Sequence, residues 1–322
     1  MRINHWKATL AIGCLVAAAF TTLAAPLRRA DVAANPAWLA HMDFDALRPT
    51  AIGQFILGEM NKPEAQAKLA AFQAVVSLDL RTQLHGVTVY GTSAIPEEGV
   101  LVVYADFDAD RLVTLAKAAK DAQNKAYKEH VIYNWIDDKK KDRNGANPRV
   151  YAAIAGARVV FGQRQERVAQ ALDVLDGASP NLAASTSLPE LGAAGDTSFL
   201  EAAASRFDLP SSDPNAAMFH LSKQGRLQLA EAQGQINGVL SLEGKDEEVA
   251  GNIASIAQGL ISLMKLHEDK PEAVKFAKAL TLKQDGPRVT VSLAMPADDV
   301  VAIMKAGAAR KAAKEAEKAA TN

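Results

Sequence analysis

The stretch "GVTVYGTSAIPEEGVLVVYADF" (Gly86–Phe107) places two apolar runs on either side of a polar loop. Gly86–Gly91 and Gly99–Phe107 are rich in valine and tyrosine, which favour strands. With the connecting loop "TSAIPEE", the two runs predict an antiparallel hairpin. Antiparallel hairpins alternate face by face, so they allow a sheet with helices packed against one side.

Helical and strand patterns extend in both directions from this hairpin. Apolar side chains at helical spacing are Ile52, Phe55, Ile56 and Met60; Leu69, Phe72 and Val76 after Pro63; Leu112, Leu115, Ala116 and Ala119; and Val168, Ala171, Leu172 and Leu175 before Gly177. Further strands are predicted at Ala37–Phe44, His130–Trp135, Arg149–Ala155 and Arg158–Gly162.

The second half of the chain repeats this rhythm. "SFLEAAAS" (Ser198–Ser205) is compatible with a strand or a helix, and we interpret it as the opening strand of this half. The hairpins fall at Gly225–Gly244 and Ala279–Ala294, the latter with an Asp285-Gly286 turn. A long helix from about Asp246 to His267 lies between them, and a last helix follows them. We therefore predict an α+β fold of two similar domains, each a mainly antiparallel sheet with helices packed on one face. Chance resemblance between hairpins explains the repeat equally well.

Composition shifts place the boundaries of these units. We predict a signal peptide at 1–24, an N-terminal α+β domain at 25–177, a linker at 178–197, a C-terminal α+β domain at 198–308 and a polar helical or disordered tail at 309–322. The linker stands out because alanine, serine, proline and glycine dominate it.

The N-terminus has the layout of a secretory signal peptide. Arg2 and Lys7 precede an apolar run at Ala8–Phe20, and small residues allow cleavage after Ala24. The run is short for a membrane anchor, and the sequence around Cys14 only loosely matches a lipobox. We expect a periplasmic or secreted protein whose mature chain has no cysteine, and therefore no thiol chemistry.

Charge balance and absent motifs narrow the function classes. Lysine plus arginine (36) nearly equals aspartate plus glutamate (37), which argues against a nucleic-acid partner. The chain lacks the nucleophile elbow, the phosphate loop, the dinucleotide fingerprint and the zinc-protease helix. The long apolar helix contains Asn252, Gln258 and Lys265, so we predict a well-buried core helix and no membrane span in the mature chain.

A short acidic motif occurs twice, in "HMDFDALR" (His41–Arg48) and "YADFDADR" (Tyr104–Arg111). Paired carboxylates two residues apart could bind a divalent cation or a sugar hydroxyl. Each pair also lies where a strand ends and a helix begins, so we favour a structural corner. We predict that Asp108 caps a helix, and that Asp45 forms a turn before a helix starting near Pro49.

The candidate binding residues are grouped in the N-terminal half. His41, Asp43, His85 and Asp106 could form a metal-dependent or carbohydrate-active site, although their spacing matches no metal motif. Tyr133 and Trp135 could offer an aromatic surface to sugars or peptides. Locally hydrogen-bonded histidines and core aromatics explain the same residues without any ligand.

Three segments resemble a group of uncharacterised exported bacterial proteins. They are "QLHGVTVYG" (Gln83–Gly91), "YKEHVIYNW" (Tyr127–Trp135) and "ALDVLDG" (Ala171–Gly177), in this order. The resemblance covers most of 33–177 and implies export and a shared α+β architecture. It assigns no catalytic residue.

The sequence therefore favours an exported binding or interaction module that is not an enzyme and needs no cofactor. Its partner would be an unknown component of the cell envelope or another protein. The metal-dependent or carbohydrate-active site is the alternative, and a self-associating structural protein is a third interpretation.

Overall fold

The computed structural model describes residues 26–93, 95–139, 141, 145–188, 191, 197–205, 207, 217–266 and 270–320. The predicted signal peptide, with Cys14, lies outside the described residues, as does part of the predicted linker. Export therefore stays a prediction from the sequence.

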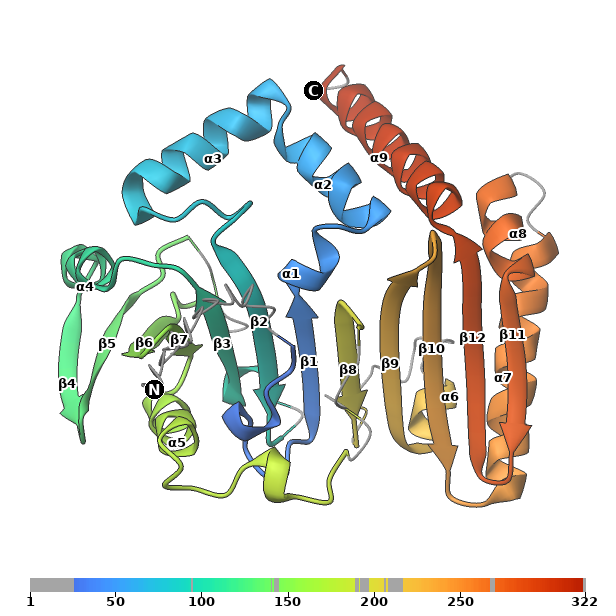
Figure 1. Cartoon of the computed structure of the whole chain (residues 1–322), viewed down its shortest axis with the longest axis horizontal. Helices are drawn as coiled ribbons and strands as arrows, with labels where there is room; N and C mark the ends of the chain where they lie inside the picture. The colour runs from blue at the N-terminus through green and yellow to red at the C-terminus, as the bar shows by residue number, and fades with distance from the viewer. Residues whose placement is uncertain are drawn as a thin grey trace, which may run out of the picture.

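Twelve strands form one continuous sheet in which every pair of neighbours is antiparallel. Figure 1 shows them side by side as one curved wall, in the order β11-β12-β10-β9-β8-β1-β2-β3-β7-β6-β5-β4. Their bounds are β1 Trp38–Asp43, β2 Leu84–Gly91, β3 Gly99–Ala105, β4 Gln123–Tyr127, β5 His130–Ile136, β6 Arg149–Ala155, β7 Arg158–Gly162, β8 Leu200–Ala204, β9 Ser222–Ala232, β10 Gln235–Gly244, β11 Leu280–Asp285 and β12 Arg288–Pro296.

The two halves of the chain meet inside this sheet. The opening strand predicted for the second half is confirmed as β8, and Trp38–Met42 of β1 pair with Leu200–Ala204 of β8. A Cβ on Gly91, opposite Trp38, would lie 2.6 Å from the Trp38 ring, so glycine is needed there. The α+β class and the antiparallel sheet are confirmed, and the structure adds that both halves share one sheet.

Helices flank this sheet. They are α1 Phe44–Leu47, α2 Ala51–Met60, α3 Pro63–Val76, α4 Ala109–Ala118, α5 Gln165–Leu175, α6 Ala217–His220, α7 Glu247–Leu266, α8 Pro271–Lys278 and α9 Ala297–Ala320. In Figure 1, α2 and α3 arch over one end of the strands of the N-terminal half. The Lys305 ammonium of α9 lies 5.8 Å from the ring centre of Phe55 in α2, a cation–π contact that joins the last helix to the arch.

The two faces of the N-terminal half have different neighbours. Helix α5 packs on one face over a close-packed core that includes Val102, Val160 and Leu172. Val103 and Val159, one residue away on the same strands, point to the opposite face, beneath α4. The helices of this half therefore cover both faces of the sheet, and the second covered face is where the candidate site lies.

Two elements and one burial pattern differ from the sequence-based expectation. Strand β4 was not predicted, because it is a polar edge strand with no apolar alternation, and neither was the short helix α8. Helix α7 was expected to be heavily buried, but only Ala250, Ile253, Ala257 and Ile261 are buried. These four positions follow helical spacing, so α7 packs by one stripe on the strands β10, β11 and β12.

Among the described residues, α7 is the one helix that meets the length and composition of a membrane span. The same length and composition are found in core helices of soluble proteins, so this observation alone is weak evidence for a membrane span.

Candidate functional site

A large apolar cavity lies between the sheet and the helices α3 and α4. Its volume is about 600 Å³, within the range of roughly 300–1,000 Å³ that is usual for small-molecule sites. Protein interiors are normally close-packed, with few voids larger than a water molecule. The space beneath α3 and α4 is partly open to solvent, so it is a hollow bounded by the sheet and these helices and not a closed void in the interior.

The sheet supplies the floor of the cavity. Side chains that share one face of β2, β3, β7, β6 and β5 line it, because residues two apart on a strand point to the same side. These floor residues are Val87, Val103, Val159, Phe161, Ala152, Ile154, Tyr133 and Trp135. The neighbouring positions on the same strands face the core beneath α5.

Two helices and a loop supply the walls. Leu112, Leu115 and Ala116 of α4 form one side, and Leu78 and Leu80 of the loop before β2 form another. Phe107, from the second acidic motif, also lines the cavity.

Helix α3 covers the cavity loosely. None of its residues is buried, and Phe72 and Val75, which line the cavity, are 37% and 50% exposed. The helix contacts its neighbours α2 and α4 more than it contacts any strand. A loosely packed helix over an apolar space has the arrangement of a cover.

The repeated acidic motifs are structural corners, as predicted, with one correction. Asp108 accepts a hydrogen bond of 3.0 Å from the Arg111 amide and caps α4. In the first copy the cap is Asp43, which accepts from the Ala46 amide at 2.9 Å. The helix predicted to start near Pro49 is α2, which begins at Ala51 with its own cap at Thr50. Asp45 does not form a separate turn before it, because the one-turn helix α1 starts directly after Asp43 and contains Asp45.

The aspartate that does not cap its helix contacts the same histidine in both copies. His85 Nδ1 lies 3.0 Å from Asp45 Oδ2, and His85 Nε2 lies 3.0 Å from Asp106 Oδ2. The second contact is within ion-pair distance, although its angle does not fit a hydrogen bond. One imidazole therefore ties the two corners together beside the cavity.

The arginine that ends each motif holds the segment between α3 and β2. Arg48 donates to Asp45 and to the carbonyls of Arg81 and Leu84. Arg111 donates from Nε to the Val75 carbonyl at 2.7 Å and from Nη2 to the Ala74 carbonyl at 3.1 Å. The two copies thus clamp the two ends of the segment 74–84, which carries Leu78 and Leu80 into the cavity wall.

The predicted site residues do not gather around one point. His41 is buried on the α5 face, where its Nδ1 lies 2.8 Å from Thr88 Oγ1, and Asp43 is used as a helix cap. His85 and Asp106 meet at the corner of the cavity. Tyr133 and Trp135 line the cavity floor.

This arrangement does not favour the metal-dependent alternative. In the part of the chain that the structure describes, no group of three or more His, Asp or Glu side chains could hold a metal ion. At His85 the reason is geometric: the two carboxylates contact opposite nitrogens of the ring, so they cannot converge on one cation.

The two aspartates of the "ALDVLDG" segment have structural partners. Asp173 accepts hydrogen bonds from Lys128 and Tyr127, and the Lys128 hydrogen bond is the main cause that lowers the pKa of this carboxyl. Asp176 lies 2.9 Å from His130 Nε2. Both contacts fasten the β4–β5 turn to α5.

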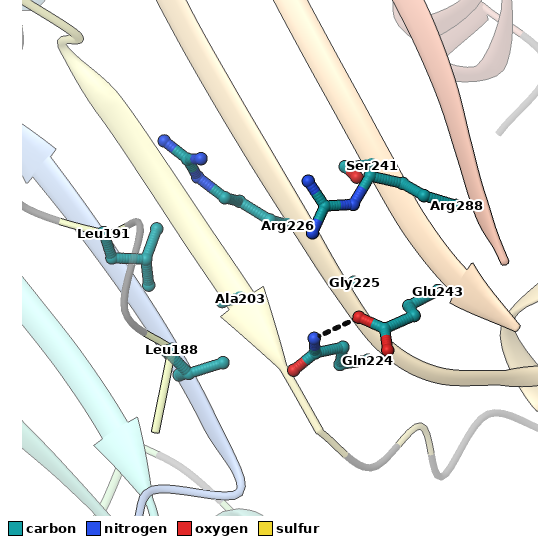
Figure 2. A pocket seen from close by; sticks show the side chains of 9 residues that line it. All are labelled: Leu188, Leu191, Ala203, Gln224, Gly225, Arg226, Ser241, Glu243 and Arg288. Atoms are coloured by element: carbon teal, nitrogen blue, oxygen red, sulfur yellow. Dashed lines mark hydrogen bonds between the residues drawn. The ribbon is translucent and has the colours of Figure 1, made fainter. Parts of the chain in front are cut away.

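A second hollow lies on the other half of the sheet and is shown in Figure 2. It is lined by residues of β8, β9, β10 and β12, and Gln224 donates to Glu243 at 2.6 Å across it. Its volume is only about 70 Å³, far below that of a small-molecule site. It is therefore not the candidate site.

Comparisons with known proteins assign this chain to no family and find only distant similarity to solved structures. No family model and no curated protein matches the chain. Among solved structures, TP0453 in crystal form III is similar with a TM-score of 0.46 and 10% sequence identity, covering 86% of this chain and 97% of that chain. TP0453 in crystal form I gives a TM-score of 0.43 at 10% identity, with 87% and 97% covered. These likenesses carry no argument about function.

Sequence reasoning identified Tyr133 and Trp135 but missed the cavity. The available evidence was the run "GVLVVYADF", which is apolar at almost every position. A continuous apolar run indicates a strand covered on both faces. Nothing in the sequence indicates that the helices over one of those faces leave a cavity between themselves and the sheet.

Proposed function

We propose that this protein is an exported, non-enzymatic binding module for an apolar ligand with a flexible hydrocarbon portion, such as an acyl chain. The observation that carries the proposal is the 600 Å³ cavity, whose lining includes no charged side chain. Burying hydrocarbon in such a space removes apolar surface from water, at roughly 25 cal/mol per Å². The signal-peptide pattern supports a role outside the cytoplasm.

The lining of the cavity suits a flexible hydrocarbon ligand, because its side chains are almost entirely apolar. A flexible chain of methylene groups can fill the same space along its irregular walls.

Exposure of the cover supports the same proposal. Phe72 and Val75 leave apolar surface in contact with solvent, although they line the cavity. A ligand in the cavity would cover part of this surface. Exposed apolar side chains around a hollow are typical of ligand-binding grooves.

Binding of diphenylhexatriene, a fluorescent hydrocarbon without polar atoms, tests the proposal. We expect its fluorescence to rise saturably when the protein is added. Ala116→Phe places a ring in the cavity and should weaken this binding about tenfold, since small volume changes in an apolar pocket have effects of that order. The free energy of unfolding of this variant should be equal or higher, because the cavity is partly filled.

Ala118→Phe is the matched control for this experiment. Ala118 lies on the same helix but is exposed to solvent and does not line the cavity. The control should bind the probe as the parent does. No saturable binding to the parent, or equal affinity of the parent and Ala116→Phe, would contradict the proposal.

A further inference from the structure

We infer that the ligand is an uncharged amphiphile whose polar end is a hydrogen-bond acceptor, such as the carbonyl of an acyl ester, and that Tyr133 and Trp135 bind this end. The inference rests on the proposed function and specifies the ligand of the same cavity.

The polar atoms of the cavity lining are confined to one strand. Every lining side chain except Tyr133 and Trp135 is purely hydrocarbon. These two residues are two apart on β5, so they point to the same face with Cα atoms about 7 Å apart. The Tyr133 hydroxyl and Trp135 Nε1 are therefore the polar side-chain groups found among the residues that line the cavity.

The chemistry of the two groups selects the polar end. Tryptophan Nε1 can only donate a hydrogen bond, and a tyrosine hydroxyl can donate or accept one. A ligand group that accepts hydrogen bonds satisfies both residues. A group that only donates would leave the Trp135 N–H without a partner.

The absence of charge in the lining selects a neutral ligand. A carboxylate or phosphate moved into an apolar space needs an opposite charge or several hydrogen bonds to offset its lost hydration. None of the lining residues is charged. An ester or amide carbonyl loses much less hydration and needs only the donors that are present.

The arginines beside the cavity are already engaged. Arg48 and Arg111 both contact the segment 74–84, and both direct their guanidinium groups to its backbone carbonyls. Binding an anionic head group through either arginine would break these hydrogen bonds. This second observation also favours an uncharged ligand over a fatty acid or a phospholipid head.

Displacement of diphenylhexatriene by two ligands of equal chain length, methyl tetradecanoate and tetradecanoate, tests the inference. We expect the ester to bind the parent more tightly than the carboxylate. Tyr133→Phe should weaken ester binding about 3- to 10-fold, the usual effect of one hydrogen bond, and should change diphenylhexatriene affinity less than about twofold.

Tyr151→Phe is the matched control. Tyr151 lies on β6, and its neighbour Ala152 is the residue that pairs with Tyr133 and lines the cavity, so Tyr151 points to the opposite face of the sheet. The control should bind both ligands as the parent does. If Tyr133→Phe does not fold, Trp135→Phe removes the other hydrogen-bond donor. The ratio of ester affinity to diphenylhexatriene affinity should then fall in Trp135→Phe relative to the parent.

The outcomes separate this inference from the proposed function. Equal binding of the ester by the parent and Tyr133→Phe, or tighter binding of the carboxylate, would overturn the inference while leaving an apolar cavity intact. Failure of diphenylhexatriene to bind the parent would overturn both.

Discussion

His85 owes its position to a one-residue bulge in β2. Leu84 pairs with Ala105 and Gly86 pairs with Tyr104, so His85 is an extra residue in the strand. Bulges redirect side chains and are frequent beside functional sites. Leu84 and Val87 are three residues apart, so in a regular strand they would point to opposite faces, but the bulge allows both to line the cavity. The bulge also directs the His85 side chain towards Asp45 and Asp106.

The first prediction concerns this histidine. His85→Ala removes the hydrogen bond to Asp45 and the close contact with Asp106, and it should lower the free energy of unfolding by about 1–3 kcal/mol, the range expected when a buried polar group loses its partner. Urea denaturation would measure the change. A metal chelator should leave the stability of the parent unchanged. If chelation lowered the stability of the parent to that of His85→Ala, the corner would be a metal site and this interpretation would be wrong.

Residue-scale predictions from the sequence succeeded where one local rule applied. Asp108 was predicted as a helix cap because an aspartate between a strand and an apolar helical pattern can accept from the free amides. The meeting of Asp45 and Asp106 at His85 could not be predicted, because it depends on the bulge and on the pairing of β1, β2 and β3. Sequence spacing carries no information about such distant contacts.

At the scale of elements, α3 is the least anchored part of the cavity wall. Pro63 starts the helix, and Ser77, which has a left-handed backbone with φ of 59°, ends it. The Arg111 side chain joins the last turn of α3 to α4 through two backbone carbonyls. We therefore expect that α3 can move to admit a ligand.

The second prediction concerns this contact. Arg111→Ala removes both hydrogen bonds to α3 but leaves the backbone amide that Asp108 caps. Because the cover is then held less tightly, we expect diphenylhexatriene to dissociate several-fold faster in stopped-flow experiments. Lys117→Ala, an exposed change on the same helix, is the control. An unchanged rate in Arg111→Ala, or the same increase in the control, would contradict the role of Arg111.

Most elements were predictable because their apolar periodicity is clear. Helices α2, α3, α4 and α5 and the hairpins of both halves follow the expected ranges closely. Strand β4 was missed because an edge strand with four exposed residues lacks the alternation that reveals a half-buried strand. The burial of α7 was overestimated because the helix is apolar over much of its length. Hydrophobicity alone does not show how many of its side chains will contact the sheet.

At the scale of the whole molecule, the C-terminal half supports the cavity of the N-terminal half. Glu231, at the end of β9, accepts a hydrogen bond of 2.8 Å from the amide of Ala51 at the start of α2. Lys305 of α9 contacts Phe55 of the same helix. Because α2 leads directly into α3, the second half helps to hold the cover in place.

The continuous sheet explains why this coupling was not predicted. The sequence indicates two similar successive units, and similarity alone does not say whether they pack apart or share a sheet. The pairing of β1 with β8 joins them, and it is formed by "SFLEAAAS", a segment whose strand or helix character the sequence left ambiguous. The position of one short alanine-rich strand therefore determines the architecture.

Quenching of tryptophan fluorescence by bromododecane tests most directly whether hydrocarbon enters the cavity. The bromine atom quenches an indole that it contacts, and among the tryptophans that the structure describes only Trp135 lines the cavity, whereas Trp38 is hydrogen-bonded to the Ser93 carbonyl. We predict a saturable fall in emission for the parent and for Trp38→Phe, and no saturable fall for Trp135→Phe. A fall that persists in Trp135→Phe, or no fall in the parent, would contradict the account.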